Sequence, residues 1–146
     1  MKEIWLDCDG TIVDFYGVDG WLTMLEAHDP TPYIIARPLL NLSKLARKLN
    51  KLQRAGYKLG IISWLSRSSN AEYDELVRLA KIGWLEKHLP SVKWNKIYIV
   101  AYGTSKWEIC GRTGILFDDE ERNRTAWLNG ESYEPERIFD ILSSLT

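Results

Sequence analysis

The sequence has little of what marks several large classes of protein. Its 146 residues include only two cysteines, Cys8 and Cys110, which are too few for a disulfide framework and have no metal-binding spacing around them. No apolar run approaches the roughly 20 residues of a membrane-spanning helix. Charge of one sign is not in excess either: 19 Lys and Arg against 20 Asp and Glu leave a net charge of −1. That balance argues against a partnership with long nucleic acid.

The start of the chain also has little room for a signal peptide, because an apolar strand is expected from residue 4 onward. We therefore expect a cytoplasmic protein with no membrane partner. The length and the ordinary share of hydrophobic residues, 45%, predict one globular domain over residues 1–146.

What the sequence does have is an alternation of short apolar strands and amphipathic helices. The capping patterns Ser69 with Glu72 and Ser105 with Glu108 mark two helix starts. Strands are expected at 4–6, 58–62, 97–100 and 114–117, and helices at 39–55, 71–88, 120–129 and 135–145, with a short one beginning near residue 106. The alternation predicts an α/β fold with a doubly wound, mostly parallel sheet.

One segment, at about 15–38, interrupts this alternation. It contains two glycines and three prolines around an apolar, helix-like piece at 21–25. We expect it to form a small cap inserted above the sheet, rather than a second domain.

The expected strands end in polar residues that the fold would bring together. Asp7 and Asp9 follow the first strand, Ser63 ends the second, and Asp118 and Asp119 follow the fourth. Ligands of doubly wound sheets bind at the carboxyl ends of the strands. Clustered carboxylates repel one another and take up protons unless a cation neutralises them. A hard divalent ion with oxygen ligands, Mg²⁺ first, is the expected cofactor.

These residues resemble, in order and spacing, the four motifs of the haloacid dehalogenase superfamily. Residues 7–11, DCDGT, are similar to the first motif, an apolar strand followed by DxDG(T/V), and Ser63 is similar to the second. Lys106 is similar to the third motif, and Asp118 with Asp119 to the fourth. The resemblance covers nearly the whole chain and implies a Rossmann-like core and a phosphatase activity.

The resemblance also implies a role for each residue. Asp7 would attack a phosphoryl group and form an aspartyl-phosphate, while Asp9 would protonate the leaving oxygen and later activate water. Gly10 would allow a sharp turn and a close approach of the backbone to the substrate. Ser63 would donate a hydrogen bond to a phosphoryl oxygen, and Lys106 would neutralise developing charge and orient Asp7.

Four residues would hold the metal. The resemblance assigns Mg²⁺ to the carboxylates of Asp7 and Asp118, to Asp119 directly or through water, and to the backbone carbonyl of Asp9. Simpler alternatives exist, because Asp and Gly at a strand end often form only a turn. Acids such as Asp118 and Asp119 are also favoured at the start of a helix.

Other polar residues compete for these roles or have ordinary ones. Ser66, Ser68 or Ser69 could cap the next helix in place of Ser63, and most lysines, including those at 81, 93 and 96, are expected to be solvated at the surface. Cys8 is expected to be a packed core thiol. The two histidines, His28 and His88, are expected at the surface rather than as ligands.

Two short matches bear on the substrate. Asp14 with Phe15, and residues 81–90, KIGWLEKHLP, are similar to segments of the 5′(3′)-deoxyribonucleotidase group. Thr11 and the sequence Ser63-Trp64-Leu65 depart from that group's usual Val and Thr-Ser-Pro. The expected cap is also shorter, so the group's nucleobase pocket is not carried over to this chain.

The residues around the expected site offer substrate contacts of their own. Trp64 and Arg67, just past the second strand, could reach the leaving group or a second phosphate. Tyr16, Trp21 and Tyr33 in the cap could stack on a base, or equally could hold the cap to the core.

The predicted function is therefore Mg²⁺-dependent hydrolysis of a small phosphomonoester, with a nucleotide as the first choice of substrate. A phosphatase for nucleic-acid ends or sugar phosphates is one alternative. A non-catalytic nucleotide-binding protein on the same fold is another, and the presence of both Asp7 and Asp9 argues against it. The oligomeric state is not predicted.

Overall fold

The computed structural model describes residues 2–111, 113–128 and 130–146 and has a parallel five-stranded sheet at its centre. The strands lie side by side in the order β3 (Lys96–Val100), β2 (Lys58–Trp64), β1 (Glu3–Leu6), β4 (Ile115–Phe117) and β5 (Glu131–Tyr133). From β1 the chain first builds outward through β2 and β3, and then returns to add β4 and β5 on the other side of β1. The reversal creates a crevice beyond the carboxyl ends of β1 and β4, which is where ligands of such folds bind.

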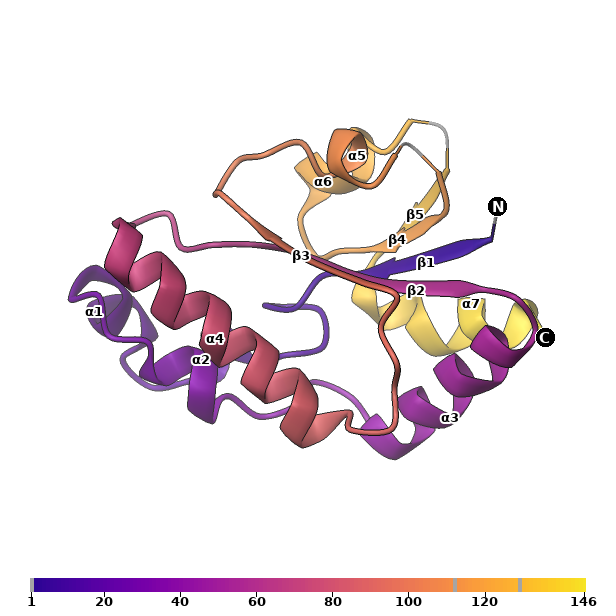
Figure 1. Cartoon of the computed structure of the whole chain (residues 1–146), viewed down its shortest axis with the longest axis horizontal. Helices are drawn as coiled ribbons and strands as arrows, with labels where there is room; N and C mark the ends of the chain where they lie inside the picture. The colour runs from indigo at the N-terminus through magenta and orange to yellow at the C-terminus, as the bar shows by residue number, and fades with distance from the viewer. Residues whose placement is uncertain (1, 112, 129) are drawn as a thin grey trace.

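Helices cover both faces of the sheet, as Figure 1 shows. One face carries α3 (Leu42–Arg54), α4 (Ala71–His88) and α7 (Ile138–Ser144), and the other carries α5 (Lys106–Ile109) and α6 (Glu121–Thr125). Successive strand residues point to opposite faces. Ile4 and Leu6 accordingly pack in the larger hydrophobic cluster, and Trp5 packs in the smaller one. The predicted α/β fold, with its doubly wound parallel sheet, is confirmed.

Asparagine side chains cap two helices where the prediction had a different start or a different capping residue. The first helix begins at Leu42 rather than at Leu39, since the Asn41 side chain accepts the N–H of Lys44 and ends the irregular chain there. The helix over 71–88 has the predicted bounds, but its cap is Asn70, which accepts the N–H of Tyr73 at 2.8 Å. The Ser69 cap was therefore wrong.

The other predicted cap is confirmed, because Ser105 accepts the N–H of Glu108 at the start of α5. That cap decides where the helix begins, and it therefore places Lys106 in the first helical position.

The region after β4 departs most from the prediction. The helix expected over 120–129 ends at Thr125, and Asn129, its expected last residue, lies outside the described residues. The edge strand β5 was not predicted, because it is three residues long and the sequence ESY has no apolar run. The final helix opens with a 3₁₀ turn, η2 (Pro135–Arg137), before α7.

The segment expected to form a cap contains three short helical pieces, η1 (Phe15–Gly17), α1 (Trp21–Glu26) and α2 (Thr31–Ile35). Figure 1 shows α1 and α2 beside α4, toward the end of the molecule opposite the N-terminus. The indole Nε1 of Trp84 on α4 donates to the carbonyl of Ala36 at 2.8 Å. The segment is thus fastened to a helix of the core.

A histidine makes a second connection between the segment and the core. His28 has a φ of 58° and its ring bonds to the side chains of Ser68 and Asn70. The ring also stacks on Tyr73 at a centroid distance of 4.9 Å. His28 is therefore half-buried and tied to the loop after β2, not a free surface residue.

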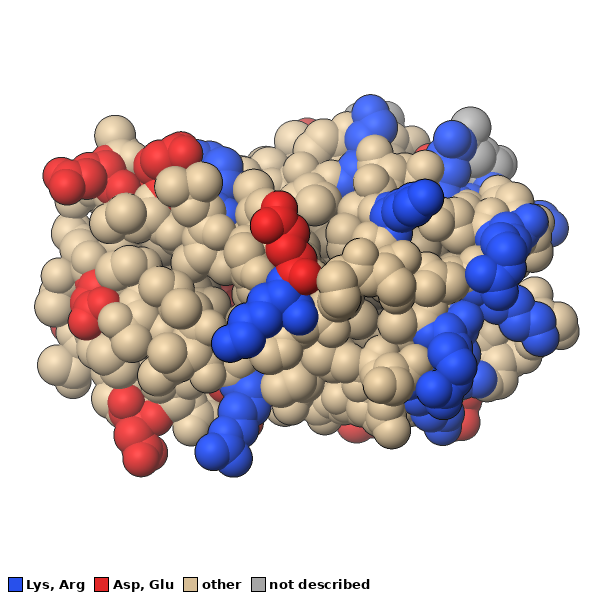
Figure 2. Space-filling model, turned by 60° about the horizontal axis from the view of Figure 1, so that its bottom comes forward, with Lys and Arg blue, Asp and Glu red and all other residues tan. Residues whose placement is uncertain are grey.

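Charge is unevenly distributed over the surface. Figure 2 shows Lys and Arg gathered at one end of the molecule, the end at which α3 lies in Figure 1. The exposed residues of α3 include Lys44, Arg47, Lys51 and Arg54. In the described part of the chain, none of the helices combines the length and the apolar character that crossing a membrane would need.

Candidate active site

Two buried carboxylates meet at the crevice between β1 and β4. Asp7 directly follows β1 and Asp118 directly follows β4, and these strands are paired neighbours. Both side chains are buried, while the adjacent Asp119 is exposed. Asp7, Asp118 and Asp119 each offer one carboxylate oxygen, and these atoms all lie within 4.8 Å of one another.

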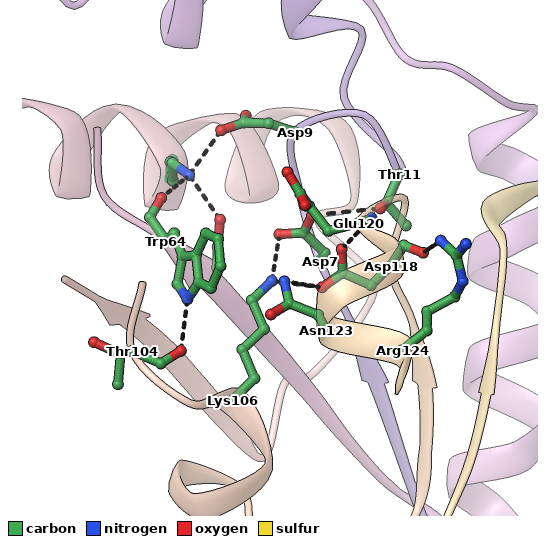
Figure 3. Close-up of polar contacts among 12 residues, drawn as sticks. Asp7, Asp9, Thr11, Trp64, Thr104, Lys106, Asp118, Glu120, Asn123 and Arg124 are labelled. Carbon is green, nitrogen blue, oxygen red and sulfur yellow. Dashed lines mark hydrogen bonds and ion pairs between the residues drawn. The ribbon is translucent and has the colours of Figure 1, made fainter. Parts of the chain in front are cut away.

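A buried lysine bridges two of these acids. The Lys106 Nζ lies 3.1 Å from Asp7 Oδ1 and 2.7 Å from Asp118 Oδ2. Figure 3 shows the Lys106 side chain reaching toward Asp7 and Asp118. Burial favours the neutral amine, but the carboxylates of Asp7 and Asp118 outweigh it and raise the pKa of Lys106 above its usual range. Lys106 is therefore a fixed ammonium that holds both acids in place.

The start of α6 holds Asp118 from the other side. The backbone N–H of Glu120 donates to Asp118 Oδ1 at 2.9 Å, and Asn123 Nδ2 donates to Oδ2 at 3.1 Å. Arg124 Nη1 donates to the Asp118 carbonyl at 2.9 Å. Sequence reasoning missed Asn123. The sequence offered one sign of its role, an amide side chain about one helical turn after Asp118 and Asp119.

The acid cluster carries more negative charge than Lys106 can balance. When all three carboxylates are ionised, they leave two negative charges in excess of the one ammonium. Burial, together with repulsion from Asp7, raises the pKa of Asp118 to about 6 and that of Asp119 to about 8. A donor set made only of carboxylate oxygens, with two charges in excess, fits a hard divalent ion such as Mg²⁺.

Gly10 makes room for the third acid. Its φ is 79°, and a Cβ at this position would lie 2.1 Å from Asp119 Oδ2. The Gly10 N–H already donates to the carbonyl of Val13 at 2.9 Å. Gly10 thus contributes space for Asp119 and a tight turn, and its N–H is taken by the protein rather than left for a substrate.

The second acid of the first motif belongs to a different cluster. The Asp9 carboxylate accepts a hydrogen bond from Lys81 Nζ at 2.9 Å, and the same Nζ donates to Ser63 Oγ at 2.6 Å. Burial raises the pKa of Asp9, and the charge of Lys81 works against that shift. The predicted metal contact through the Asp9 carbonyl stays a prediction, while the Asp9 side chain is engaged elsewhere.

Lys81 is the residue that sequence reasoning placed wrongly. It was expected to be a solvated surface lysine, but its side chain is only 2% exposed. The carbonyl of Trp64 also accepts a hydrogen bond from its Nζ, at 2.7 Å. Three oxygen acceptors around one ammonium explain how the charge is tolerated in the interior.

These two clusters share one pocket of about 210 Å³. Asp7, Asp9, Ser63, Lys106 and Asp119 line it, together with Trp64 and Arg67. The structure therefore brings the predicted catalytic side chains to a single place, together with Trp64 and Arg67, the two residues predicted to contact the substrate. Gly10 and Asp118 stand behind this lining.

Aromatic side chains form the walls of the pocket. On the cap side, Tyr16 is 53% exposed and packs edge-on against Trp21. On the opposite side, the indole of Trp64 is fixed by a 2.8 Å hydrogen bond to the Thr104 carbonyl and tilts against Tyr102. Tyr33 also lines the pocket, but it is buried with Phe15 and serves mainly to hold the segment to the core.

Neither cysteine is an alternative nucleophile. Cys8 and Cys110 are both buried, and burial raises the pKa of each thiol to about 12. A thiol in this state is a poor nucleophile at neutral pH. Cys8 is the core thiol that the sequence predicted.

No family model and no curated protein matches the sequence. Solved structures do match. A D,D-heptose 1,7-bisphosphate phosphatase from Burkholderia thailandensis has a TM-score of 0.52 at 14% identity, covering 98% of this chain and 99% of that one. The same kind of phosphatase from B. bronchiseptica, complexed with magnesium and phosphate, has a TM-score of 0.52 at 14% identity, with 86% and 74% covered. At this identity the likeness shows a shared fold.

Proposed function

We propose that this protein is a Mg²⁺-dependent phosphomonoester hydrolase of the haloacid dehalogenase type. The observation that carries the proposal is the bridge from Lys106 Nζ to Asp7 and Asp118 at the ends of two paired strands. With Asp9 and Ser63 in the same pocket, all four motifs of the resemblance converge on one place. The shared fold with two sugar bisphosphate phosphatases supports the same class of reaction.

Asp7 is the nucleophile in this proposal. An Asp7 carboxylate oxygen attacks phosphorus, the bond from phosphorus to the leaving oxygen breaks, and Asp9 gives that oxygen a proton. Asp9 then takes a proton from water, which attacks the phosphorus of the aspartyl-phosphate and releases inorganic phosphate. Lys106 keeps Asp7 oriented and offsets the charge that develops during both transfers.

Asp7, Asp118 and Asp119 would hold Mg²⁺, with the Asp9 carbonyl as a further ligand. When bound, the ion neutralises charge on the phosphoryl oxygens.

The walls of the pocket favour a substrate with a flat group beyond its phosphate. The volume of about 210 Å³ is below the roughly 300–1,000 Å³ of typical ligand pockets. The phosphoryl end therefore fits inside while the rest of the substrate lies against Tyr16, Trp21 and Trp64. Stacking on such side chains suits a nucleobase, so a nucleoside monophosphate is the proposed substrate. A sugar phosphate is the second candidate, favoured by the activity of the two structural neighbours.

The test is phosphate release from nucleoside 5′- and 3′-monophosphates, sugar phosphates and a phosphorylated oligonucleotide, with Mg²⁺ and with a chelator. Mg²⁺-dependent release from one class is expected, and Asp7→Asn should abolish it. Asp140→Asn, the same change at an exposed site on α7, is the matched control and should leave the rate unchanged.

The class of compound from which phosphate is released fastest identifies the substrate class. Faster release from sugar phosphates than from nucleotides would make a sugar phosphate the substrate. Tight nucleotide binding without release, equal in wild type and Asp7→Asn, would contradict hydrolysis and indicate a binding protein.

A further inference from the structure

Lys81 lies in the middle of α4, yet its side chain reaches Asp9 and Ser63 at the pocket. Its neighbours one turn away on the same helix face, Val77, Trp84 and Leu85, are buried hydrophobic residues. A leucine or methionine would fill such a position at lower cost, because a buried ammonium loses its hydration. The fold itself therefore gives no reason for a charge at residue 81.

The contacts of Lys81 all concern the site. Its Nζ donates to Asp9 Oδ2, to Ser63 Oγ and to the Trp64 carbonyl, at 2.9, 2.6 and 2.7 Å. Asp9, Ser63 and Trp64 each line the pocket. One ammonium thus ties together three parts of the wall near the expected leaving group.

The direction of these hydrogen bonds restricts where protons can sit. An ammonium only donates, so the atom it contacts on Asp9, Oδ2, must act as an acceptor. The carbonyl oxygen of a carboxylic acid accepts better than its O–H oxygen, so this contact favours the proton of Asp9 on Oδ1. In the same way Ser63 Oγ accepts from Lys81, which leaves its own hydrogen for a different acceptor.

We propose that Lys81 is a positioning residue for departure of the leaving group. It holds the Asp9 carboxyl group so that Oδ1 presents the proton to the leaving oxygen, and it turns the hydroxyl hydrogen of Ser63 toward a phosphoryl oxygen. This inference rests on the proposed phosphomonoesterase function and deepens it. Lys106, on the other side of the pocket, contacts Asp7 and Asp118 and serves the attacking side.

The proposal predicts a dependence on the leaving group. A nucleoside monophosphate releases a basic alkoxide and needs the proton from Asp9, whereas p-nitrophenyl phosphate releases a stable phenolate and needs it far less. The ratio kcat/KM reports the steps through the first phosphoryl transfer and leaves out the later attack of water. The comparison of kcat/KM between the two substrates therefore isolates proton donation.

The experiment measures kcat/KM on both substrates for wild type, Lys81→Met and Lys87→Met, with thermal unfolding of each protein. Lys87 is on the same helix but is exposed, so Lys87→Met is the matched control. Lys81→Met should lose about 100-fold on the nucleotide and at least about ten times less on p-nitrophenyl phosphate, within the usual range for general acid catalysis. Its unfolding temperature should stay within a few degrees of wild type, since an apolar side chain suits the position.

Equal losses on the two substrates, or no loss, would overturn the role of Lys81 while leaving the proposed function intact. No hydrolysis of either substrate by wild type would instead overturn the proposed function and this inference with it. If Lys81→Met does not fold, Lys81→Gln keeps an N–H donor and removes the charge, and the same unequal losses are expected of it.

Discussion

The pocket has two sides that are built in different ways. The proposed function makes one of them the attacking side and the other the leaving-group side. The attacking side has Asp7 and Asp118 on Lys106, with Asp119 beside them, and its residues lie at the ends of β1 and β4 and at the start of α5. The leaving-group side, with Asp9 and Ser63 around one lysine, depends on a side chain that reaches in from the middle of α4. The first is a product of strand topology and the second of helix packing.

The two sides also differ in charge. On the attacking side three carboxylates face one ammonium, so the fully ionised cluster has two negative charges for a divalent ion to neutralise. On the leaving-group side Asp9 and Lys81 balance each other. The difference explains why a metal is expected on one side alone, and why a neutral hydrogen-bond network is sufficient on the other.

The largest expected effect comes from substituting Asp7 on the attacking side. Asp7→Asn removes the nucleophile and should lower kcat by at least about 10⁴-fold on every substrate, because a nucleophile cannot be replaced by its neighbours. Steady-state phosphate release measures this. Residual turnover near the wild-type rate would show that another group attacks phosphorus.

The next largest effect is expected at Lys106, and it distinguishes this lysine from Lys81. Lys106→Met should lower kcat/KM by about 10²- to 10³-fold, the usual cost of removing a group that stabilises developing charge. The loss should be similar for a nucleotide and for p-nitrophenyl phosphate, because Lys106 acts on the attacking side. A loss confined to the nucleotide would mean that Lys106 also serves the leaving group.

A smaller effect is expected at the wall of the pocket. Trp21→Ala should raise KM for a nucleoside monophosphate by about tenfold, in line with the value of stacking one base on an aromatic ring. KM for a sugar phosphate should change much less, and kcat should hold for both. If both substrates lose equally, Trp21 serves to hold the cap segment in place and does not contact the base.

The smallest effect concerns stability and pH. The pKa values of Asp118 and Asp119 are raised in the folded protein to about 6 and about 8, so the folded state binds more protons than the unfolded state between about pH 4 and pH 8. Without metal, stability should therefore fall as pH rises through this window. Mg²⁺ should reverse the fall, raising the unfolding temperature by a few degrees more at pH 8 than at pH 5.5.

Thermal unfolding in a chelator and in excess Mg²⁺ over this pH range measures the difference. Asp119→Asn serves as the comparison. The unfolding temperature of this variant should change less with pH, because the substitution removes the acid with the higher pKa. A gain from Mg²⁺ that is the same at every pH would show that protons and metal do not compete at this cluster.

The sequence predicted that Asp7, Lys106 and the acids after β4 lie together, because each of them stands beside an apolar strand or a helix cap. Asp7 directly follows the apolar residues 4–6 of β1, and Asp118 directly follows the apolar strand β4. The Ser105 cap marks the start of the helix that carries Lys106. The parallel sheet was predicted from the alternation of apolar strands and amphipathic helices along the sequence. Adjacency in the chain predicted where these residues lie, and the resemblance to the four motifs supplied the roles proposed for them.

The rest could not be obtained in this way, for physical reasons that differ. Lys81 stands mid-helix, and its burial depends on which face of α4 the sheet covers, a tertiary property. The edge strand β5 is held by pairing with β4 and has no hydrophobic pattern of its own. Asn and Ser are about equally favourable as helix caps, so the sequence does not distinguish Asn70 from Ser69. The backbone conformation before α4 decides that Asn70 is the cap.

The most direct test of the account is the mass of the peptide that contains Asp7 after acid quenching during turnover. Asp9→Asn is the best protein for it, since p-nitrophenyl phosphate can phosphorylate Asp7 without an acid while the attack of water lacks its base. The account predicts one added phosphoryl group on Asp7, absent from the double variant with Asp7→Asn. If wild type hydrolyses p-nitrophenyl phosphate while Asp9→Asn gains no phosphoryl group on Asp7, or gains one on another residue, the account is contradicted.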